Sequence, residues 1–215
     1  MVGWRGRQFM RTSNLSALLA GGRVWVGFAD ALWSVAYDWG VRLDTAYPGN
    51  ARRMVEATVR RGDRVLDVGI GTGMLAETGA VLADEYIGID YSGSMLSKAA
   101  RKMARLGLGN VSLRWGDALE LPFDDHSFDA VVSSFVLPHF AREERPDVIA
   151  EMARVLRPGG RLGLFLAQGE VVSLFPTRTE LEEQLSAAGC TAIRIVDRDH
   201  VYRIVEARRG RASLG

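Results

Sequence analysis

The feature that most constrains the fold is an alternation of short apolar runs with amphipathic helical patterns, which begins at Asp63. Five of these runs have the length and β-branched content of buried strands. They are "RVLDV" (64–68), "YIGI" (86–89), "VSLRW" (111–115), "AVVSSF" (130–135) and "RLGLFLA" (161–167). Because strands that alternate with helices form parallel sheets with crossover connections, the pattern predicts an α/β fold.

Two helical patterns between these runs have clear ends. Residues 92–106 carry apolar side chains on one face and basic side chains on the other, with Ser92 as the N-cap and Gly107 as the stop signal. A later helix reaches "RPGG" (157–160), where Pro158 cannot continue a helix and the two glycines allow a turn. We therefore expect a strand to begin after this turn.

The C-terminal region predicts one more helix and a hairpin. Thr179 and Glu182 form a capping-box pattern ahead of an apolar periodicity that stops at Gly189. Two extended runs follow, at 191–196 and 201–207. Their short link favours an antiparallel pair.

The region before residue 60 is expected to be largely helical. An apolar stripe recurs there at spacings of three and four: Trp25, Phe28, Leu32, Val35 and Trp39. The stripe belongs to a core helix or roofs an apolar substrate pocket, and both can hold together. "YPGN" (47–50) predicts a turn, and Met54, Val55 and Val59 indicate a helix after it.

The composition is that of a globular protein, with 215 residues of which 47% are hydrophobic and 25% charged, and we expect a single domain over residues 1–215. The net charge of +1 disfavours a nucleic-acid partner. One cysteine excludes an internal disulfide, and three scattered histidines form no metal-site pattern, so no metal is expected. Without a leader pattern or an apolar run of about 20 residues, we expect a cytoplasmic protein with no integral membrane segment, as a monomer or homodimer.

The segment most informative about function is "VLDVGIGTGMLAE" (65–77), a buried strand that runs into Gly69, Gly71 and Gly73 and then into a helix. Glycines let the chain turn tightly and approach a ligand, and the helix N-terminus offers free amides. Asp90 ends the next strand, 19 residues after Gly71. A carboxylate there can accept hydrogen bonds from both ribose hydroxyls. Together these features predict an adenosine-bearing ligand.

The spacing of the glycines bears on which ligand this is. A dinucleotide fingerprint reads G-x-G-x-x-G, whereas this chain has Met74 at the third glycine position. The spacing therefore disfavours a nicotinamide dinucleotide, and an NAD-dependent oxidoreductase remains an alternative.

Five stretches carry a resemblance to a known family. In chain order they are "VLDVGIGTG", "YIGIDYSGSML", "GDALELPFDDHSFDAV", "SSFVLPHF" and "RVLRPGGRL". This ordered set resembles the class I S-adenosylmethionine-dependent methyltransferases, most closely the branch of ubiquinone/menaquinone C-methyltransferases and phospholipid N-methyltransferases, over about residues 37 to 207. The resemblance implies a three-layer Rossmann-like fold with a seven-stranded, mostly parallel sheet and an antiparallel last strand. We expect a cofactor-binding core at 61–209 and N-terminal helices, at about 12–60, that cover the site.

The resemblance implies S-adenosylmethionine as the cofactor and assigns residues to it by position. Asp90 would hold the ribose, Tyr91 would lie against the adenine, and Asp117 would accept from its exocyclic amine. Tyr37 matches a position that closes over the cofactor. The full set assigned to cofactor binding is Tyr37, Asp67, Gly69, Gly71, Gly73, Asp90, Tyr91, Met95, Gly116, Asp117, Ala118, Ser134 and Phe135.

His139 is the candidate catalytic residue. It is either a general base that faces the methyl acceptor or a lone histidine that hydrogen-bonds a backbone carbonyl, and Pro138 stands where many relatives carry a second histidine. Structural explanations also stay open for three other residues: Asp67 as a cap of the turn, Asp117 as an ordinary loop acid, and Tyr37 as a packing residue.

These observations lead to a functional hypothesis. We expect a methyltransferase that moves a methyl group by in-line displacement to a small, partly apolar acceptor such as a quinone, a phenol or a lipid amine. Such a displacement needs alignment of two reactants more than it needs reactive side chains. The main alternative is a non-catalytic S-adenosylmethionine-binding module that serves a partner protein.

Overall fold

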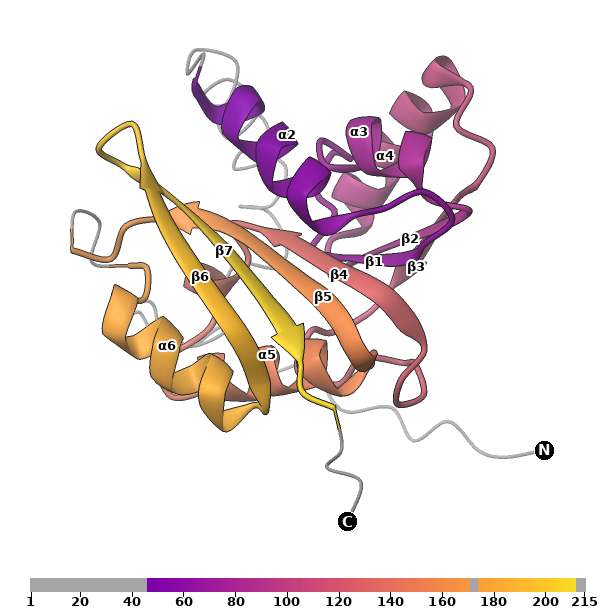
Figure 1. Cartoon of the computed structure of the whole chain (residues 1–215). Helices are drawn as coiled ribbons and strands as arrows, with labels where there is room; N and C mark the ends of the chain where they lie inside the picture. The colour runs from indigo at the N-terminus through magenta and orange to yellow at the C-terminus, as the bar shows by residue number, and fades with distance from the viewer. Residues whose placement is uncertain (1–45, 171–173, 212–215) are drawn as a thin grey trace, which may run out of the picture.

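The fold is a seven-stranded sheet with helices on both faces (Figure 1). The computed structural model describes residues 46–170 and 174–211. The strands are β1 (Arg64–Val68), β2 (Glu85–Asp90), β3 (Val111–Trp115), β4 (Phe128–Ser134), β5 (Leu156–Ala167), β6 (Cys190–Arg198) and β7 (Tyr202–Arg209). The helices are α2 (Ala46–Thr58), α3 (Ala76–Leu82), α4 (Gly93–Leu106), the short 3-10 helix η2 (Leu137–His139), α5 (Arg145–Arg154) and α6 (Arg178–Ala187). The predicted α/β class is confirmed.

The strand order explains where a ligand can bind. The sheet runs β3-β2-β1-β4-β5-β7-β6. Strands β1 to β5 pair in parallel, whereas β7 pairs antiparallel with both β5 and β6, so the predicted C-terminal hairpin is confirmed. The order reverses between β1 and β4. In open α/β sheets, the crevice for a ligand lies outside the carboxyl ends of the strands at such a reversal.

The core consists of two apolar layers, one on each face of the sheet. Helices α2, α3 and α4 pack on one face, and α5 and α6 pack on the other (Figure 1). The central strands are buried on both faces, which explains why "RVLDV" and "AVV" read as continuous apolar runs rather than as alternating ones. Val65 and Ala130 belong to the first layer, and Leu66 and Val131 to the second.

The predicted ends of α4 are confirmed. The Ser92 hydroxyl accepts a hydrogen bond from the Met95 amide at 3.2 Å, which satisfies one of the unpaired donors at the helix start. Gly107 ends the helix in the left-handed conformation, with φ of 68°. The helix therefore starts directly after the end of β2, at the edge of the sheet where a ligand is expected.

Two predictions about helix starts are wrong. "YPGN" is not a turn but the first part of α2, because proline fits the first turn of a helix, where its missing amide is not needed. The capping box of α6 uses Thr177 and Glu180 rather than Thr179 and Glu182. Both pairs fit the S/T-x-x-E pattern, and only the position at which the chain leaves its extended conformation selects between them.

Strand β5 begins earlier than the sequence suggests. Leu156 already pairs with Phe128 of β4, and the next pair is Ala130 with Arg161, so "RPGG" is a bulge within the strand. A bulge tolerates both the missing amide of proline and a glycine at positive φ, here 79° at Gly159. Strands β1 and β3 have their predicted bounds, and β2, β4, β6 and β7 differ from theirs by one or two residues at each end.

Part of the N-terminal prediction lies outside the described residues. Tyr37 and the apolar stripe from Trp25 to Trp39 belong to this part, and of the expected covering region only residues from 46 onward are described. Helix α2 packs against β4, β5 and β7. Within the described residues, no helix combines the length and the apolar character that a bilayer crossing requires.

Because α2 packs closely on β5, one methyl group added to β5 at Gly163 should lower the stability of the protein. A Cβ added at Gly163 would lie 2.3 Å from Thr58 Oγ1 and 2.6 Å from Met54 Sδ, both in α2. Gly163→Ala should therefore lower the free energy of unfolding by about 1–3 kcal/mol through overpacking. Urea titration measures this change.

Gly49→Ala is the control. Gly49 lies in α2, the helix that Gly163 contacts, and a Cβ at Gly49 meets no atom within 4 Å. It should raise the free energy of unfolding by about 0.5–1 kcal/mol because alanine favours the helix. Equal effects of the two substitutions would contradict the close contact.

Candidate active site at the carboxyl ends of the central strands

The glycine segment forms a tight turn between β1 and α3. Gly69, Gly71 and Gly73 all adopt positive φ, at 70°, 55° and 82°. The amides of Gly69 and Ile70 both donate to the Ile89 carbonyl at 2.9 Å, which ties the turn to β2. A Cβ at Gly69 would lie only 2.0 Å from a methyl carbon of Val136, so the turn also closes against the residues after β4. The first position therefore requires glycine for two independent reasons.

Asp90 connects the turn to the start of α4. Its Oδ2 accepts from the Gly71 amide at 2.8 Å, and its Oδ1 accepts from the Ser92 amide at 2.9 Å. The sequence placed Asp90 at the end of the second strand, and the structure confirms this position. A carboxylate can accept more than two hydrogen bonds, so the same group can hold the turn and contact a ligand hydroxyl.

Asp67 is a buried carboxylate directly before the turn, with 0% of its surface exposed. Its Oδ2 accepts from the Tyr86 hydroxyl at 2.8 Å. Its Oδ1 has no hydrogen-bond partner in residues 46–170 and 174–211. Burial raises the pKa of Asp67 to about 7; the Tyr86 hydrogen bond opposes this rise, and the charge of Asp90 adds to it.

The residues predicted for the adenine edge lie beside the end of β2. The Gly116 amide donates to the Asp90 carbonyl at 3.2 Å, and Gly116 and Ala118 are both buried. Asp117 is half-buried, and its Oδ1 accepts from the Leu119 amide at 3.0 Å. This hydrogen bond is compatible with the alternative in which Asp117 only shapes the loop.

Two exposed aromatic rings lie together at this end. Tyr91 is 46% exposed and Trp115 is 59% exposed, with 5.2 Å between their ring centroids. The Trp115 indole donates to the Tyr91 carbonyl at 3.0 Å. In the sequence, Trp115 is recognisable only as part of a strand. Its place as the last residue of β3 could have identified it as a residue near the candidate site.

An aromatic cluster surrounds the end of β4. Ser134 Oγ lies 2.7 Å from the Tyr47 hydroxyl of α2. Phe135 has a φ of 57°, an uncommon conformation for a non-glycine residue, and residues held in this way concentrate at functional sites. Its ring lies with those of Tyr47, Phe165, Phe175 and Tyr202, at centroid distances of 5.3, 5.5, 5.1 and 6.2 Å. The sequence did not predict this cluster, because its members come from α2, β4, β5, β7 and the segment before α6.

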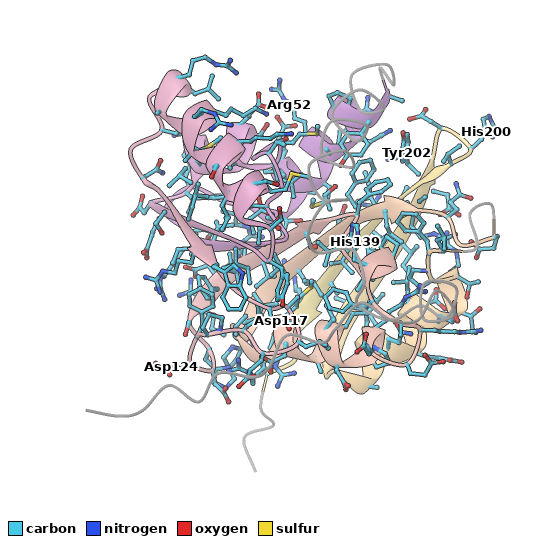
Figure 2. All side chains as sticks on the ribbon, turned by 180° about the vertical axis from the view of Figure 1, so that it is seen from behind. Arg52, Asp117, Asp124, His139, His200 and Tyr202 are labelled. Carbon is cyan, nitrogen blue, oxygen red and sulfur yellow. The ribbon has the colours of Figure 1, made fainter. Side chains whose placement is uncertain are left out.

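His139 lies at the end of η2, which follows β4. Its side chain is exposed, and its ring makes no hydrogen bond to a carbonyl within the described part of the chain. Partial desolvation lowers its pKa, and the charge of Asp90 opposes this change. In the view of Figure 2, His139 lies between Asp117 and Tyr202, whereas His200 lies at the tip of the β6–β7 hairpin.

Met95 and Tyr37 complete the predicted set. Met95 is the third residue of α4 and is buried. Tyr37 lies outside the described residues. Across residues 46–170 and 174–211, no three or more His, Cys, Asp or Glu side chains gather as they would around a metal ion.

Comparison with known proteins gives the family context. Residues 65–160 match the family model described as "Methyltransferase domain". A phosphatidylethanolamine N-methyltransferase of Cereibacter sphaeroides is 43% identical over 113 residues, covering 52% of this chain and 54% of that protein. A ubiquinone/menaquinone biosynthesis C-methyltransferase of Pseudomonas fluorescens is 36% identical over 143 residues, covering 62% and 55%. The chain thus spans about half the length of the curated relatives it matches.

A solved structure shares the fold. A SAM-dependent methyltransferase of Aquifex aeolicus superposes with a TM-score of 0.65 at 21% sequence identity, covering 75% of this chain and 89% of that one. At this level of identity the likeness concerns the architecture alone.

The buried carboxylate predicts a pH dependence of stability. The folded-state pKa of Asp67 lies above its ordinary value of 3.8, so the folded protein binds a proton that the unfolded chain releases. The free energy of unfolding should therefore fall as the pH rises from 4 to 7, by up to about 4 kcal/mol from this group.

Asp67→Asn removes this contribution. The stability of Asp67→Asn relative to the wild type should rise between pH 4 and pH 8, as measured by urea titration at each pH. A difference that stays constant over this range would show that Asp67 titrates normally.

Proposed function

We propose that this chain is an S-adenosylmethionine-dependent methyltransferase that acts on a small, partly apolar acceptor, a proposal supported by the match of residues 65–160 to the methyltransferase-domain model. The observation that carries the proposal is the pair of carboxylates at the glycine turn. Asp67 and Asp90 lie on adjacent strands, and one buried oxygen of Asp67 has no partner among the described residues. A cationic ligand provides the missing interaction, because a buried carboxylate is stable only when paired.

The residues present fit this cofactor. Asp67 would take its ammonium group, with the glycine turn around its methionine and ribose part. Asp90 would hold the ribose, and Tyr91 would lie against the adenine. The remaining proposed contacts are Gly116, Asp117 and Ala118 at the adenine edge, Ser134 and Phe135 at the methionine end, Tyr37 closing over the cofactor, and Met95.

The chemistry requires little from the protein beyond placement. The bound cofactor supplies an electrophilic methyl group. Alignment of two bound reactants contributes about 7–11 kcal/mol to such a step. A well-placed base adds a factor of about 10² to 10⁴. His139 would serve as this base, since its lowered pKa keeps the imidazole neutral and able to accept a proton at pH 7.

The acceptor class rests on the apolar surroundings of the site and on the relatives. The Tyr47 and Phe175 rings pack against the Phe135 ring, and the Tyr47 hydroxyl contacts Ser134, so the end of β4 has apolar surroundings. The matched relatives are named for the methylation of quinones and of phosphatidylethanolamine. A quinone, a phenol or a lipid amine fits both observations, and the N-terminal residues would cover it.

A panel experiment tests the function against its alternatives. Incubation with S-adenosylmethionine and candidate quinones, phenols and amino lipids should give a methylated product on chromatography. Tight calorimetric binding without product from any acceptor would favour a non-catalytic module serving a partner protein. A melting temperature raised by NADH but not by S-adenosylhomocysteine would indicate an oxidoreductase. Methylation of only nucleic acid or protein would exclude the small-molecule acceptor.

Asp90→Ala should weaken the binding of S-adenosylhomocysteine at least tenfold, because it removes a charged acceptor of two hydroxyls. Isothermal calorimetry measures this change. Asp124→Ala is the matched control, since Asp124 is an exposed acid on a loop away from the turn (Figure 2). Unchanged affinity in a folded Asp90→Ala variant would remove Asp90 from the site.

His139→Ala should lower kcat by about 10² to 10⁴ for an acceptor that must lose a proton, such as a phenol or an acidic carbon, with cofactor affinity unchanged. The wild-type rate should fall as the pH drops through the lowered pKa of His139, below 6.5, and steady-state kinetics against pH measures both effects. An unchanged kcat with a phenol or acidic-carbon acceptor would exclude His139 as the base.

A further inference from the structure

We propose that Tyr86 is a positioning residue for the cofactor: its buried hydroxyl holds the Asp67 carboxylate in the charged form that binds the ammonium group of S-adenosylmethionine. This inference rests on the proposed function. In the sequence, Tyr86 is recognisable only as the first residue of the apolar run "YIGI".

The sheet register brings the two side chains together. Val65 of β1 pairs with Tyr86 of β2, and Asp67 pairs with Gly88. Directly paired residues point to the same face of a parallel sheet, as do residues two apart in one strand. Tyr86 and Asp67 are therefore diagonal neighbours on one face, with Gly88 beside them, where the Ile70 side chain occupies the space that a Cβ would need. The hydroxyl lies 2.8 Å from Asp67 Oδ2.

Helix α3 fixes the phenol in this position. A Cβ added at Gly79 would lie 2.5 Å from Tyr86 Cε2 and 3.3 Å from its hydroxyl, so the helix can approach the ring only because this residue is glycine. Tyr86 is fully buried. The hydroxyl of a ring held in this way has a fixed direction, and here it points at a carboxylate.

The surroundings of Asp67 offer no other donor among the described residues. On β4, the residue paired with Asp67 is Val132, which is apolar. On α3, Glu77 is exposed and pairs with Lys102 of α4 at 2.5 Å. Asp90 acts on Asp67 only by repulsion. The Tyr86 hydroxyl is thus the hydrogen bond that favours the charged carboxylate in the unliganded protein.

The two carboxylate oxygens of Asp67 have different surroundings. Tyr86 occupies Oδ2, and Oδ1 has no partner in the described residues. Burial raises the pKa of Asp67 to about 7, and the Tyr86 hydrogen bond acts against this rise. Without the hydroxyl, the pKa of Asp67 would rise further, and most Asp67 side chains would be protonated at neutral pH. An ammonium group would then meet a neutral acid instead of a carboxylate.

The test is the pH dependence of S-adenosylhomocysteine affinity in Tyr86→Phe. Calorimetry between pH 6 and 8.5 should show that the wild type loses affinity as the pH falls through 7, and that Tyr86→Phe moves this midpoint upward. For a rise of one pKa unit, the affinity of the variant should be about fivefold lower at pH 7 and less than about twofold lower at pH 8.5, because Asp67 of the wild type is already half protonated at pH 7. Titration of the ligand itself cancels because every variant binds the same ligand.

Two controls separate positioning from a structural role. Asp67→Asn should lose affinity at every pH with no midpoint, and adding Tyr86→Phe to it should change affinity by less than about twofold, as expected for two residues acting through one interaction. Thr58→Val removes another buried side-chain hydroxyl, one that donates to the Met54 carbonyl at 2.9 Å. It should leave the midpoint unchanged.

A second variant covers the case in which Tyr86→Phe does not fold. Gly79→Ala keeps the hydroxyl but displaces the ring, and it should move the midpoint in the same direction. An affinity loss that is equal at all pH values, or an unmoved midpoint in a folded variant, would overturn the role of Tyr86. Failure of the wild type to bind S-adenosylhomocysteine at any pH would instead refute the proposed function.

Discussion

The site depends on how closely the glycine turn packs between its neighbours. The turn is bonded to β2 through the Ile89 carbonyl and the Asp90 carboxylate, and it closes on Val136 after β4. Three segments far apart in the chain therefore meet at one point, at the reversal of strand order where α/β sheets bind ligands. Any side chain at Gly69 would separate them.

The same packing buries the carboxylate of Asp67, which lowers the stability of the folded protein. Asp67 is fully buried with one oxygen unpartnered among the described residues, which opposes folding. Under the proposed function, the cofactor ammonium group would satisfy this oxygen, and the cost to stability would be recovered as binding energy. Asp90 differs from Asp67 because backbone amides support it on the protein side. The two acids therefore differ: backbone amides hold Asp90 in place, whereas Asp67 is a buried carboxylate.

The sequence predicted well the features that depend on neighbouring residues. The seven strands, the Ser92 cap of α4 and the C-terminal hairpin follow from local periodicity and turn chemistry. It failed where two local solutions compete, as with the Thr177 and Thr179 capping patterns, or where a rule has a positional exception, as with Pro48 in the first turn of α2. Local propensity cannot rank such alternatives, because tertiary contacts decide between them.

By itself, the sequence determined the fold class, the glycine turn and the placement of acids at the ends of β1 and β2, since strand periodicity and glycine positions are local properties of the chain. Only the tertiary structure decided which side chains surround those acids. The aromatic cluster around Phe135 draws on segments up to 155 residues apart, from Tyr47 to Tyr202, and the contact between Tyr86 and Asp67 depends on strand register and on the approach of Gly79. Register and helix packing are set by burial across the whole sheet, and no local pattern encodes them.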